Sequence, residues 1–346
     1  MTVIRPFGLN DIGLVRRLQR EGMPLAMEHM LAHPHQPLWT ALTAPWPWAG
    51  VGVASFVLDE WVDGRRLTGF VQLMKRTTRP EADLLHVAPT VAAADDLAGP
   101  APTDCGAGAR IWGRLLAHCQ RAAAGHGLQR IYASAPDGCI EQQCLREATF
   151  SPYTRETIYR LAAAPPAGGA LVGFRPQTPQ DSWALQRLYT RNTPPLVQQA
   201  EGALTGEVGS PPLSWWEPDS WRGLVWEPAG EARAAVQVHI GRAGHWLRLW
   251  GANEISPREL RSLVEQGLRQ IDLLRRSRRT VPVYTTVREY ESGLRGALTG
   301  FGFAPFMERV RFVKHTVIMA RQPAAVAAVG HEVRQEMPAH SQMGRL

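Results

Sequence analysis

The sequence predicts an α+β protein built from two tandem domains. The chain has 346 residues, which suits two domains of ordinary size. Its first half recurs in the second: Arg5 is matched by Arg175 at an offset of 170 residues, and Phe150 by Phe303 at an offset of 153. Both halves also show the same order of strands and helices. A period this long indicates that a whole domain was duplicated, because solenoid repeats are far shorter.

Composition places the chain among globular proteins. Hydrophobic residues make up 45% of it and charged residues 20%. It contains no run of about 18 apolar residues that would span a membrane, and residues 1–6 lack the apolar core of a secretory signal. We therefore expect a cytoplasmic protein with no membrane partner.

The net charge of +7 hints at anionic ligands. The one dense basic run, residues 275–279, is typical of a helix C-terminus, with an anion-binding patch as the alternative. No aromatic-interleaved basic motif accompanies it, so we expect no nucleic-acid partner. The four cysteines do not form a CxxC pair, and we expect no metal. They are Cys105, Cys119, Cys139 and Cys144.

Local patterns predict each element of the first half. Leu14, Val15 and Leu18 give one apolar stripe and predict a helix. Strand-like runs on both sides of residues 62–65 predict a hairpin, and Pro89 ends the strand that follows. The expected order is a strand at 3–6, a helix at 10–20, strands at 52–59, 66–76 and 83–88, a loop at 90–108, a helix at 110–124, a strand at 129–134, a helix at 138–147 and a strand at 154–163.

The second half repeats that order after a linker. Residues 164–172 are rich in Ala, Pro and Gly and separate domains at 1–163 and 173–322. The tail at 323–346 is expected to be mobile. Ser256 and Glu259 form a capping box that opens a strong amphipathic helix. The other expected elements are a helix at 180–191, strands at 223–226, 232–240, 245–250 and 281–287, a helix at 291–298 and a strand at 308–319.

This order resembles the GNAT family of acyl-CoA N-acyltransferases. A Phe-x-Pro turn enters the last strand of each half, at Phe150 and Pro152 and again at Phe303 and Pro305. The resemblance covers residues 3–163 and 173–320, as in a tandem double-GNAT protein. It implies that each domain has a central mixed, mostly antiparallel twisted sheet flanked by helices. It also implies an acyl-CoA co-substrate, such as acetyl-CoA.

In this family, two neighbouring strands splay apart, and pantetheine lies in the gap between them. The pyrophosphate lies on the N-terminus of the long helix, where free N–H groups and the helix dipole favour anions. In the first copy, Val87 resembles the end of the splayed strand. Gly106 and Gly108 resemble the phosphate loop, and a second registration uses Arg110 and Gly113 instead. Both registrations are imperfect, so a phosphate site and a flexible loop remain alternatives.

The second copy departs further from the family pattern. The segment that leads into its long helix has no glycine pair. Pro257 has no N–H to offer, and Glu254 would repel a phosphate. We interpret this copy as a degenerate, mainly structural GNAT-like domain.

Candidate catalytic residues lie on the strand before the long helix of the first copy. A transferase must deprotonate the amine, and Glu81, Asp83 or His86 are placed to act as its base. The alternatives are solvated carboxylates at a strand edge and a packed histidine. The family's tyrosine acid is replaced by leucine at residues 145 and 298, and Tyr132, Tyr153 and Tyr159 are the aromatic hydroxyls that remain nearby.

Tryptophans gather where the family recognises its acceptor. In the first copy these are Trp39, Trp46 and Trp48, which would form walls of an acceptor site, with core packing or inter-copy contact as the alternative. The second copy has a corresponding group at Trp215, Trp216 and Trp221.

Two hypotheses follow. The first is an enzyme in which the N-terminal copy binds acyl-CoA and acylates a small-molecule amine. The second is a non-catalytic, GNAT-like ligand-binding or scaffold protein. We also expect contact between the two copies, and the sequence leaves homo-oligomer formation open.

Overall fold

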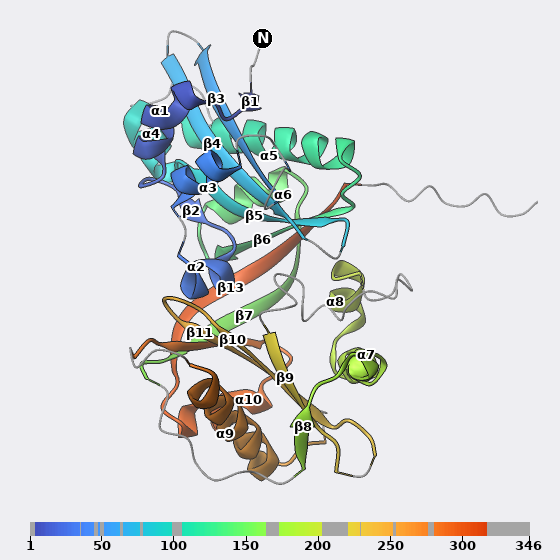
Figure 1. Ribbon diagram of the computed structural model, residues 1–346. Coiled ribbons are helices and arrows are strands. Elements are labelled where there is room, and N and C mark those ends of the chain that lie inside the picture. Colours follow the sequence, from blue (N-terminus) through green and yellow to red (C-terminus); the bar gives the residue numbers. More distant parts are fainter. Residues whose placement is uncertain are drawn as a thin grey trace, which may run out of the picture.

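The computed structural model shows two sheet-and-helix halves stacked end to end (Figure 1). It describes residues 4–34, 36–44, 48, 52–62, 65–76, 79–98, 106–163, 173–202, 221–228, 230–251, 254–275 and 280–316. The predicted linker at 164–172, the tail at 323–346 and most of the basic run at 275–279 lie outside these residues. The predicted α+β class is confirmed.

The strands join into one sheet. In chain order they are β1 (Ile4–Pro6), β2 (Met23–Pro24), β3 (Val53–Val62), β4 (Arg65–Lys75), β5 (Glu81–Ala88), β6 (Arg130–Pro136), β7 (Ser151–Leu161), β8 (Phe174–Pro176), β9 (Trp221–Trp226), β10 (Ala234–Ile240), β11 (His245–Gly251), β12 (Val283–Arg288) and β13 (Ala304–His315). Within the described residues their order is β1-β3-β4-β5-β6-β13-β7-β12-β11-β10-β9-β8, and β2 pairs with β5.

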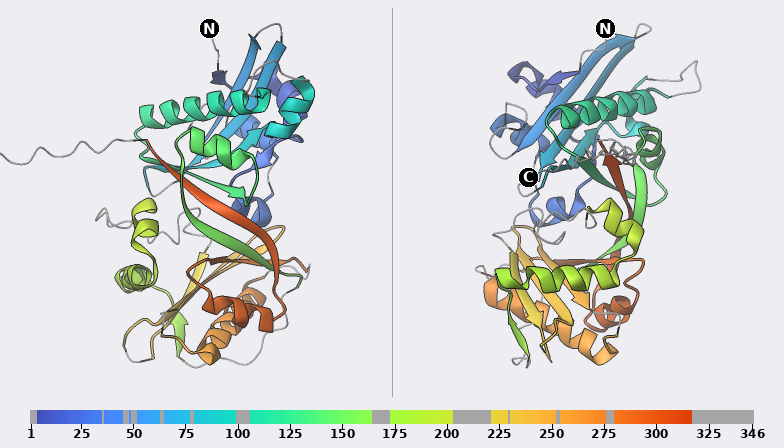
Figure 2. Two further views of the ribbon diagram at one scale, coloured as in Figure 1. Left: turned by 180° about the vertical axis from the view of Figure 1, so that it is seen from behind. Right: turned by 90° about the vertical axis from the view of Figure 1, so that its right-hand side faces the viewer.

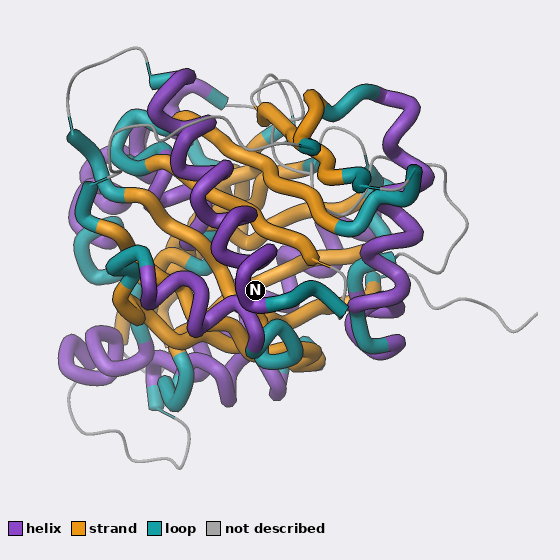
Figure 3. Tube along the Cα trace, turned by 90° about the horizontal axis from the view of Figure 1, so that it is seen from below, coloured by secondary structure: helices purple, strands orange, loops and turns teal. Residues whose placement is uncertain are grey.

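Helices lie around the strands (Figure 3) and are found in both halves (Figure 1). They are α1 (Ile12–Leu18), α2 (Met27–Ala32), α3 (Pro37–Thr43), α4 (Val91–Ala98), α5 (Ala107–Gly125), α6 (Glu141–Glu147), α7 (Ser182–Asn192), α8 (Pro195–Ala200), α9 (Pro257–Leu274) and α10 (Gly293–Gly300), with short 3-10 turns η1 (Leu9–Asp11) and η2 (Pro179–Asp181). The helix α4 lies within the segment predicted to be a loop.

The repeated residues have the same structural role in both copies. Arg5 binds Asp11 through two hydrogen bonds of 2.6 and 2.7 Å, and Arg175 binds Asp181 through two of 2.8 and 2.7 Å. Each aspartate also accepts the N–H at the start of its 3-10 turn, from Gly8 or Thr178. The duplication is therefore structural, because these bonds fix the first strand of each copy against its first helix.

The two copies exchange their last strands. The strand β13 ends the second copy but pairs with β6 of the first. The strand β7 ends the first copy but pairs with β12 of the second. Both strands cross the boundary between the halves side by side (Figure 2). The domain boundaries in the sequence stay a prediction, but the sheet itself runs continuously through both halves.

Each half has its own apolar core. In the first, Trp112, Leu115 and Leu116 of α5 pack on strands β3 to β6. In the second, Leu263, Val264 and five further apolar positions of α9 and α10 pack on β10 to β12 in the same way. The predicted capping box is present, since Ser256 Oγ accepts the Glu259 N–H at 3.3 Å.

Candidate functional site

The gap predicted between β5 and β6 exists, but the chain itself fills it. The two strands pair only as far as Asp83 and Tyr132. Beyond that point β2 lies between them. The N–H of Leu25 donates to the Leu85 carbonyl at 2.9 Å, and the N–H of Ser134 donates to the Leu25 carbonyl at 2.9 Å. The backbone of residues 23–25 therefore makes the bonds that a ligand in this gap would need.

The glycines at the start of α5 serve helix packing. The N–H of Gly108 donates to Asp95 Oδ1 at 2.9 Å, so a carboxylate from α4 already lies on this helix end. A Cβ at Gly106 would lie 2.6 Å from Asp95, and one at Gly108 would lie 2.5 Å from the Val91 carbonyl oxygen. The glycines are needed because α4 approaches closely. This geometry argues against the phosphate loop predicted here.

The remaining residues predicted to bind the cofactor do not surround an opening. Val87 is buried within β5, and Gly113 is exposed on α5. Arg110 is half-buried on the first turn of the same helix. Trp112 is fully buried and its Nε1 donates to the Pro89 carbonyl at 2.8 Å, so the indole fills the space under α5.

Two of the predicted catalytic residues belong to a buried ion cluster. Both oxygens of Asp83 accept hydrogen bonds from Arg76, at 2.8 and 2.7 Å. Glu81 accepts from Arg76 at 2.8 Å and from Arg130 at 3.2 Å. Because these arginines hold the carboxylates in place and balance their charge, the structure does not support Glu81 or Asp83 as the general base.

The third predicted catalytic residue, His86, is a packed strand histidine, which was the alternative to a catalytic role. It is buried beside Gly22, where an added Cβ would lie 2.2 Å from its Nε2, and near the ring of Phe70. Its strand pairs with β2 at this position. This packing does not present His86 to a ligand.

The predicted tryptophan wall is not assembled. Trp39 is exposed on α3, whereas Trp48 packs against the core of the first copy and the ring of His126. Trp221 is buried against His239 and beneath Arg248. Trp46, Trp215 and Trp216 lie outside the described residues.

An open cleft lies instead in the second copy, at the equivalent place. The strands β11 and β12 pair in parallel only as far as Leu247 and Thr285. Beyond them lies a cleft of about 330 Å³. Its walls come from the end of β11, the start of α9, the helix α7 and the turn between β12 and α10, and include Tyr189, Asn192, Thr193, Leu249, Trp250, Gly251, Ile255, Leu260, Tyr290, Glu291, Ser292, Gly293 and Leu294.

The cleft leads to a polar chamber of about 40 Å³ that both copies build. Six residues line both spaces: Tyr189, Thr193, Leu249, Trp250, Tyr290 and Glu291. The first copy contributes Glu28 and Glu156 to the chamber, and the second contributes Arg248, Arg288 and Arg311.

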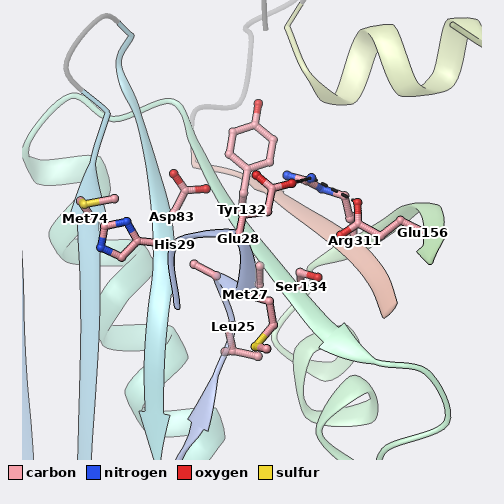
Figure 4. Close-up of a pocket in the computed structure, with 12 residues that line it drawn as sticks. Leu25, Met27, Glu28, His29, Met74, Asp83, Tyr132, Ser134, Glu156 and Arg311 are labelled. Atoms are coloured by element: carbon pink, nitrogen blue, oxygen red, sulfur yellow. Dashed lines mark hydrogen bonds and ion pairs between the residues drawn. The ribbon is translucent and has the colours of Figure 1, made fainter. Parts of the chain in front are cut away.

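A second small cavity, of about 30 Å³, borders this chamber on the side of the first copy. Glu28, Glu156 and Arg311 line both, and they meet at one side of the cavity (Figure 4). Leu25 and Met27 form an apolar wall below them. The carboxylates therefore separate a space in the first copy from a space in the second.

Ion pairs between the copies fix the chamber. Glu28 accepts from Arg248 at 3.0 Å and from Arg311 at 3.4 Å, and Glu156 accepts from Arg311 at 3.3 Å. Burial opposes ionisation of Glu28, but the two arginines outweigh burial and lower its pKa. Glu28 is therefore a charged wall of the chamber at neutral pH.

Glu201, which directly follows α8, is held more strongly still. It accepts hydrogen bonds from Arg288 at 2.6 Å, from the Tyr189 hydroxyl at 2.6 Å and from the Tyr153 hydroxyl at 3.4 Å. Burial would raise its pKa, but Arg288 and Arg311 overcome this and the pKa falls to about 2. Its role is structural, because its oxygens are fully engaged.

Glu291 differs from these carboxylates. Its Oε2 accepts the backbone N–H of Arg288 at 2.9 Å, and burial raises its pKa above the ordinary value despite the attraction of the Arg288 guanidinium. The side chain lines both the cleft and the chamber. Next to it, Tyr290 accepts a hydrogen bond from Arg288 at 2.7 Å, and burial raises its pKa to about 12. A carboxylate with a raised pKa at a cleft is a candidate general base.

Comparison with solved structures identifies the fold. A GCN5-related N-acetyltransferase from Sphaerobacter thermophilus matches with 13% sequence identity, 92% coverage of this chain, 96% coverage of that chain and a TM-score of 0.50. The match necessarily spans both halves. The chain has the GNAT fold.

Other solved structures align with lower TM-scores. A tandem GNAT protein from the clavulanic acid biosynthesis pathway matches with 15% identity, 92% of this chain, 100% of that chain and a TM-score of 0.44. A putative acetyltransferase from Pyrococcus horikoshii matches with 12% identity, 92% of this chain, 90% of that chain and a TM-score of 0.48. No protein-family model and no curated protein matches the chain.

The described residues contain neither a candidate membrane span nor a candidate metal-ligand group. None of their helices is both long and apolar enough to cross a membrane. No three of their His, Cys, Asp or Glu residues are grouped as metal ligands would be.

Proposed function

We propose that the chain is an acyl-CoA-dependent N-acyltransferase, with acetyl-CoA as the simplest donor and a small-molecule amine as acceptor. The donor binds in the second copy, where β11 and β12 part. The observation that carries this proposal is the cleft of about 330 Å³ at that place, which Glu291 lines. In the first copy, the corresponding gap is occupied by residues 23–25.

The donor and the acceptor approach from opposite ends of the cleft. The acyl-bearing arm runs along the wall formed by Leu249, Ile255 and Leu260, and its thioester reaches the chamber. The acceptor amine occupies the chamber, whose walls carry four carboxylates and three arginines. This net negative charge favours a cationic amine over an anion.

Glu291 takes the proton that the amine must lose. The amine nitrogen then attacks the thioester carbonyl carbon, the new C–N bond forms and the C–S bond breaks. The departing thiolate takes up a proton from the Tyr290 hydroxyl or from solvent. The products are an amide and a free thiol. A base with a raised pKa suits this step because it shares the proton more evenly with the amine.

A cavity-filling pair of variants tests the location. Gly293 lines the cleft on the first turn of α10, and a Cβ there would contact Leu260 at an ordinary 3.5 Å. Gly296 lies on the same helix with nothing within 4 Å of an added Cβ, and it does not line the cleft. Calorimetric titration should show at least a tenfold weaker acetyl-CoA affinity for Gly293→Phe, about 1.4 kcal/mol. The control Gly296→Phe should bind as the parent protein does.

Three outcomes would count against the proposal. Equal affinity in Gly293→Phe and Gly296→Phe would move the donor out of this cleft. If the parent protein does not bind acetyl-CoA at millimolar concentration, the proposed acyltransferase function is excluded. Binding without thiol release in the presence of a broad panel of amines would instead favour the non-catalytic ligand-binding protein.

A further inference from the structure

Both long helices carry one of the chain's own carboxylates at the N-terminal end. At α5 the carboxylate is that of Asp95, which accepts the Gly108 N–H at 2.9 Å. At α9 it is that of Glu259, which accepts the N–H and the hydroxyl of Ser256, both at 2.7 Å. In the first copy the carboxylate comes from the neighbouring helix α4, and in the second it belongs to the capping box of α9 itself.

At α9, the helix beside the proposed donor cleft, such contacts occupy the N–H groups of Ser256 and Glu259, which a pyrophosphate could otherwise use. Helix N-termini bind phosphate through N–H groups that the helix leaves unpaired. In α9 the N–H of Glu259 is bound by Ser256 Oγ at 3.3 Å, and Pro257 has no N–H. Hydrogen bonds from Ser256 lower the pKa of Glu259, so its carboxylate stays charged at neutral pH and repels a second anion.

The cleft beside α9 is suited to the other end of the donor. Leu249, Ile255 and Leu260 give it an apolar wall, and the end of β11, beyond its pairing with β12, borders it. A pantetheine arm has amide groups for strand edges and methylene groups for an apolar wall. The nucleotide of CoA would extend from the cleft toward the capped end of α9.

Building on the proposed function, we propose that the donor is recognised through its pantetheine arm and that its nucleotide adds little affinity. The substrate class is then the acyl-phosphopantetheine thioesters, of which acyl-CoA is one member. The reaction is unchanged, because the nucleotide takes no part in forming the amide or releasing the thiol.

Titration with three donors tests this proposal on the full chain. The probes are acetyl-CoA, S-acetyl-4′-phosphopantetheine and S-acetylpantetheine. The proposal expects dissociation constants within about fivefold of one another. A 50-fold or greater advantage of acetyl-CoA over both would overturn it while leaving the acyltransferase intact. If none of the three binds, both the inference and the proposed function fail.

A charge-removing variant gives a second readout. Glu259→Gln keeps the capping box, because glutamine also occupies this position of the motif. Removing one charge near a helix end should tighten acetyl-CoA binding about two- to fivefold and leave S-acetylpantetheine unchanged. The control is Glu265→Gln, further along the same helix. Weaker acetyl-CoA binding in Glu259→Gln alone would overturn the proposal, because the nucleotide would then depend on this helix end.

Discussion

Removing the charge of Glu201 should destabilise the junction between the copies. Its carboxylate is buried and receives Arg288 from β12, Tyr189 from α7 and Tyr153 from β7. Glu201→Gln keeps the size of the side chain but leaves the guanidinium of Arg288 without its counter-charge. Breaking one partner of a buried ion pair costs about 3–5 kcal/mol.

The pKa of Glu201 gives an independent value for the same effect. It falls from an ordinary 4.5 to about 2 in the folded protein. At about 1.4 kcal/mol for each pH unit, ionised Glu201 contributes about 3 kcal/mol to stability at pH 7. Because the folded pKa is depressed, this contribution is present above pH 4.5 and is lost as the pH falls toward 2. About 1 kcal/mol should remain at pH 3.

Urea denaturation of the parent protein and Glu201→Gln, each at pH 7 and pH 3, measures both values. The free-energy difference between the two proteins should be about 3 kcal/mol at pH 7 and about 1 kcal/mol at pH 3. Glu147→Gln is the matched control, because Glu147 is exposed on α6 and bonded only to Gln143 in the described structure. A difference below 1 kcal/mol at pH 7, or one that does not change with pH, would refute this reasoning.

Three further substitutions test the chamber, the first copy and the base. Glu28→Gln should lower the free energy of unfolding by about 3–5 kcal/mol in urea, and a loss under 1 kcal/mol would show that the inter-copy ion pairs matter little. Trp112→Phe should lower the free energy of unfolding by about 1–3 kcal/mol, because the Pro89 carbonyl loses its hydrogen-bond donor. The acetyl-CoA affinity should stay unchanged, and tighter binding would indicate a site under α5. Glu291→Gln should lower kcat about 10²- to 10⁴-fold. The base acts when it is deprotonated, and the pKa of Glu291 is raised above 4.5. The activity of the parent protein should therefore begin to fall at a pH above 4.5 as the solution is acidified. A fall in activity that begins only at or below pH 4.5 would exclude Glu291 as the base.

Patterns local in sequence predicted the duplication and most elements. The Ser256 capping box, the apolar face of α9 and the β3–β4 hairpin all follow from residues close together in the chain, and the structure contains them. The helix α4 was missed because the prolines and glycines that surround it favour a loop, although its own alanines favour a helix. The exchange of β7 and β13 has no local signal, because the paired residues lie more than 120 positions apart in the sequence.

The sequence predicted the candidate site in the first copy, whereas the open cleft lies in the second. Contacts that are not visible in the sequence explain much of this difference. Glu81 and Asp83 stand on the expected strand, and Arg76, which binds both, is only five and seven residues away from them in the sequence. Arg130 comes from β6, which only the fold brings beside Glu81. The segment at 23–25 that fills the first gap was likewise invisible in sequence. Glu291 offered one signal, a carboxylate at the start of the short helix in the repeat. The second copy lacks the glycine pair of a phosphate loop, and for that reason the sequence favoured the first copy.

Hydrogen–deuterium exchange with and without acetyl-CoA tests most directly where the donor binds. With acetyl-CoA bound, exchange should be slower in the second copy, along the ends of β11 and β12 and in the turn that contains Glu291. The backbone of β5, β6 and the start of α5 should exchange at the same rate with and without the ligand. Protection confined to those first-copy segments would contradict the account and return the site to the N-terminal copy.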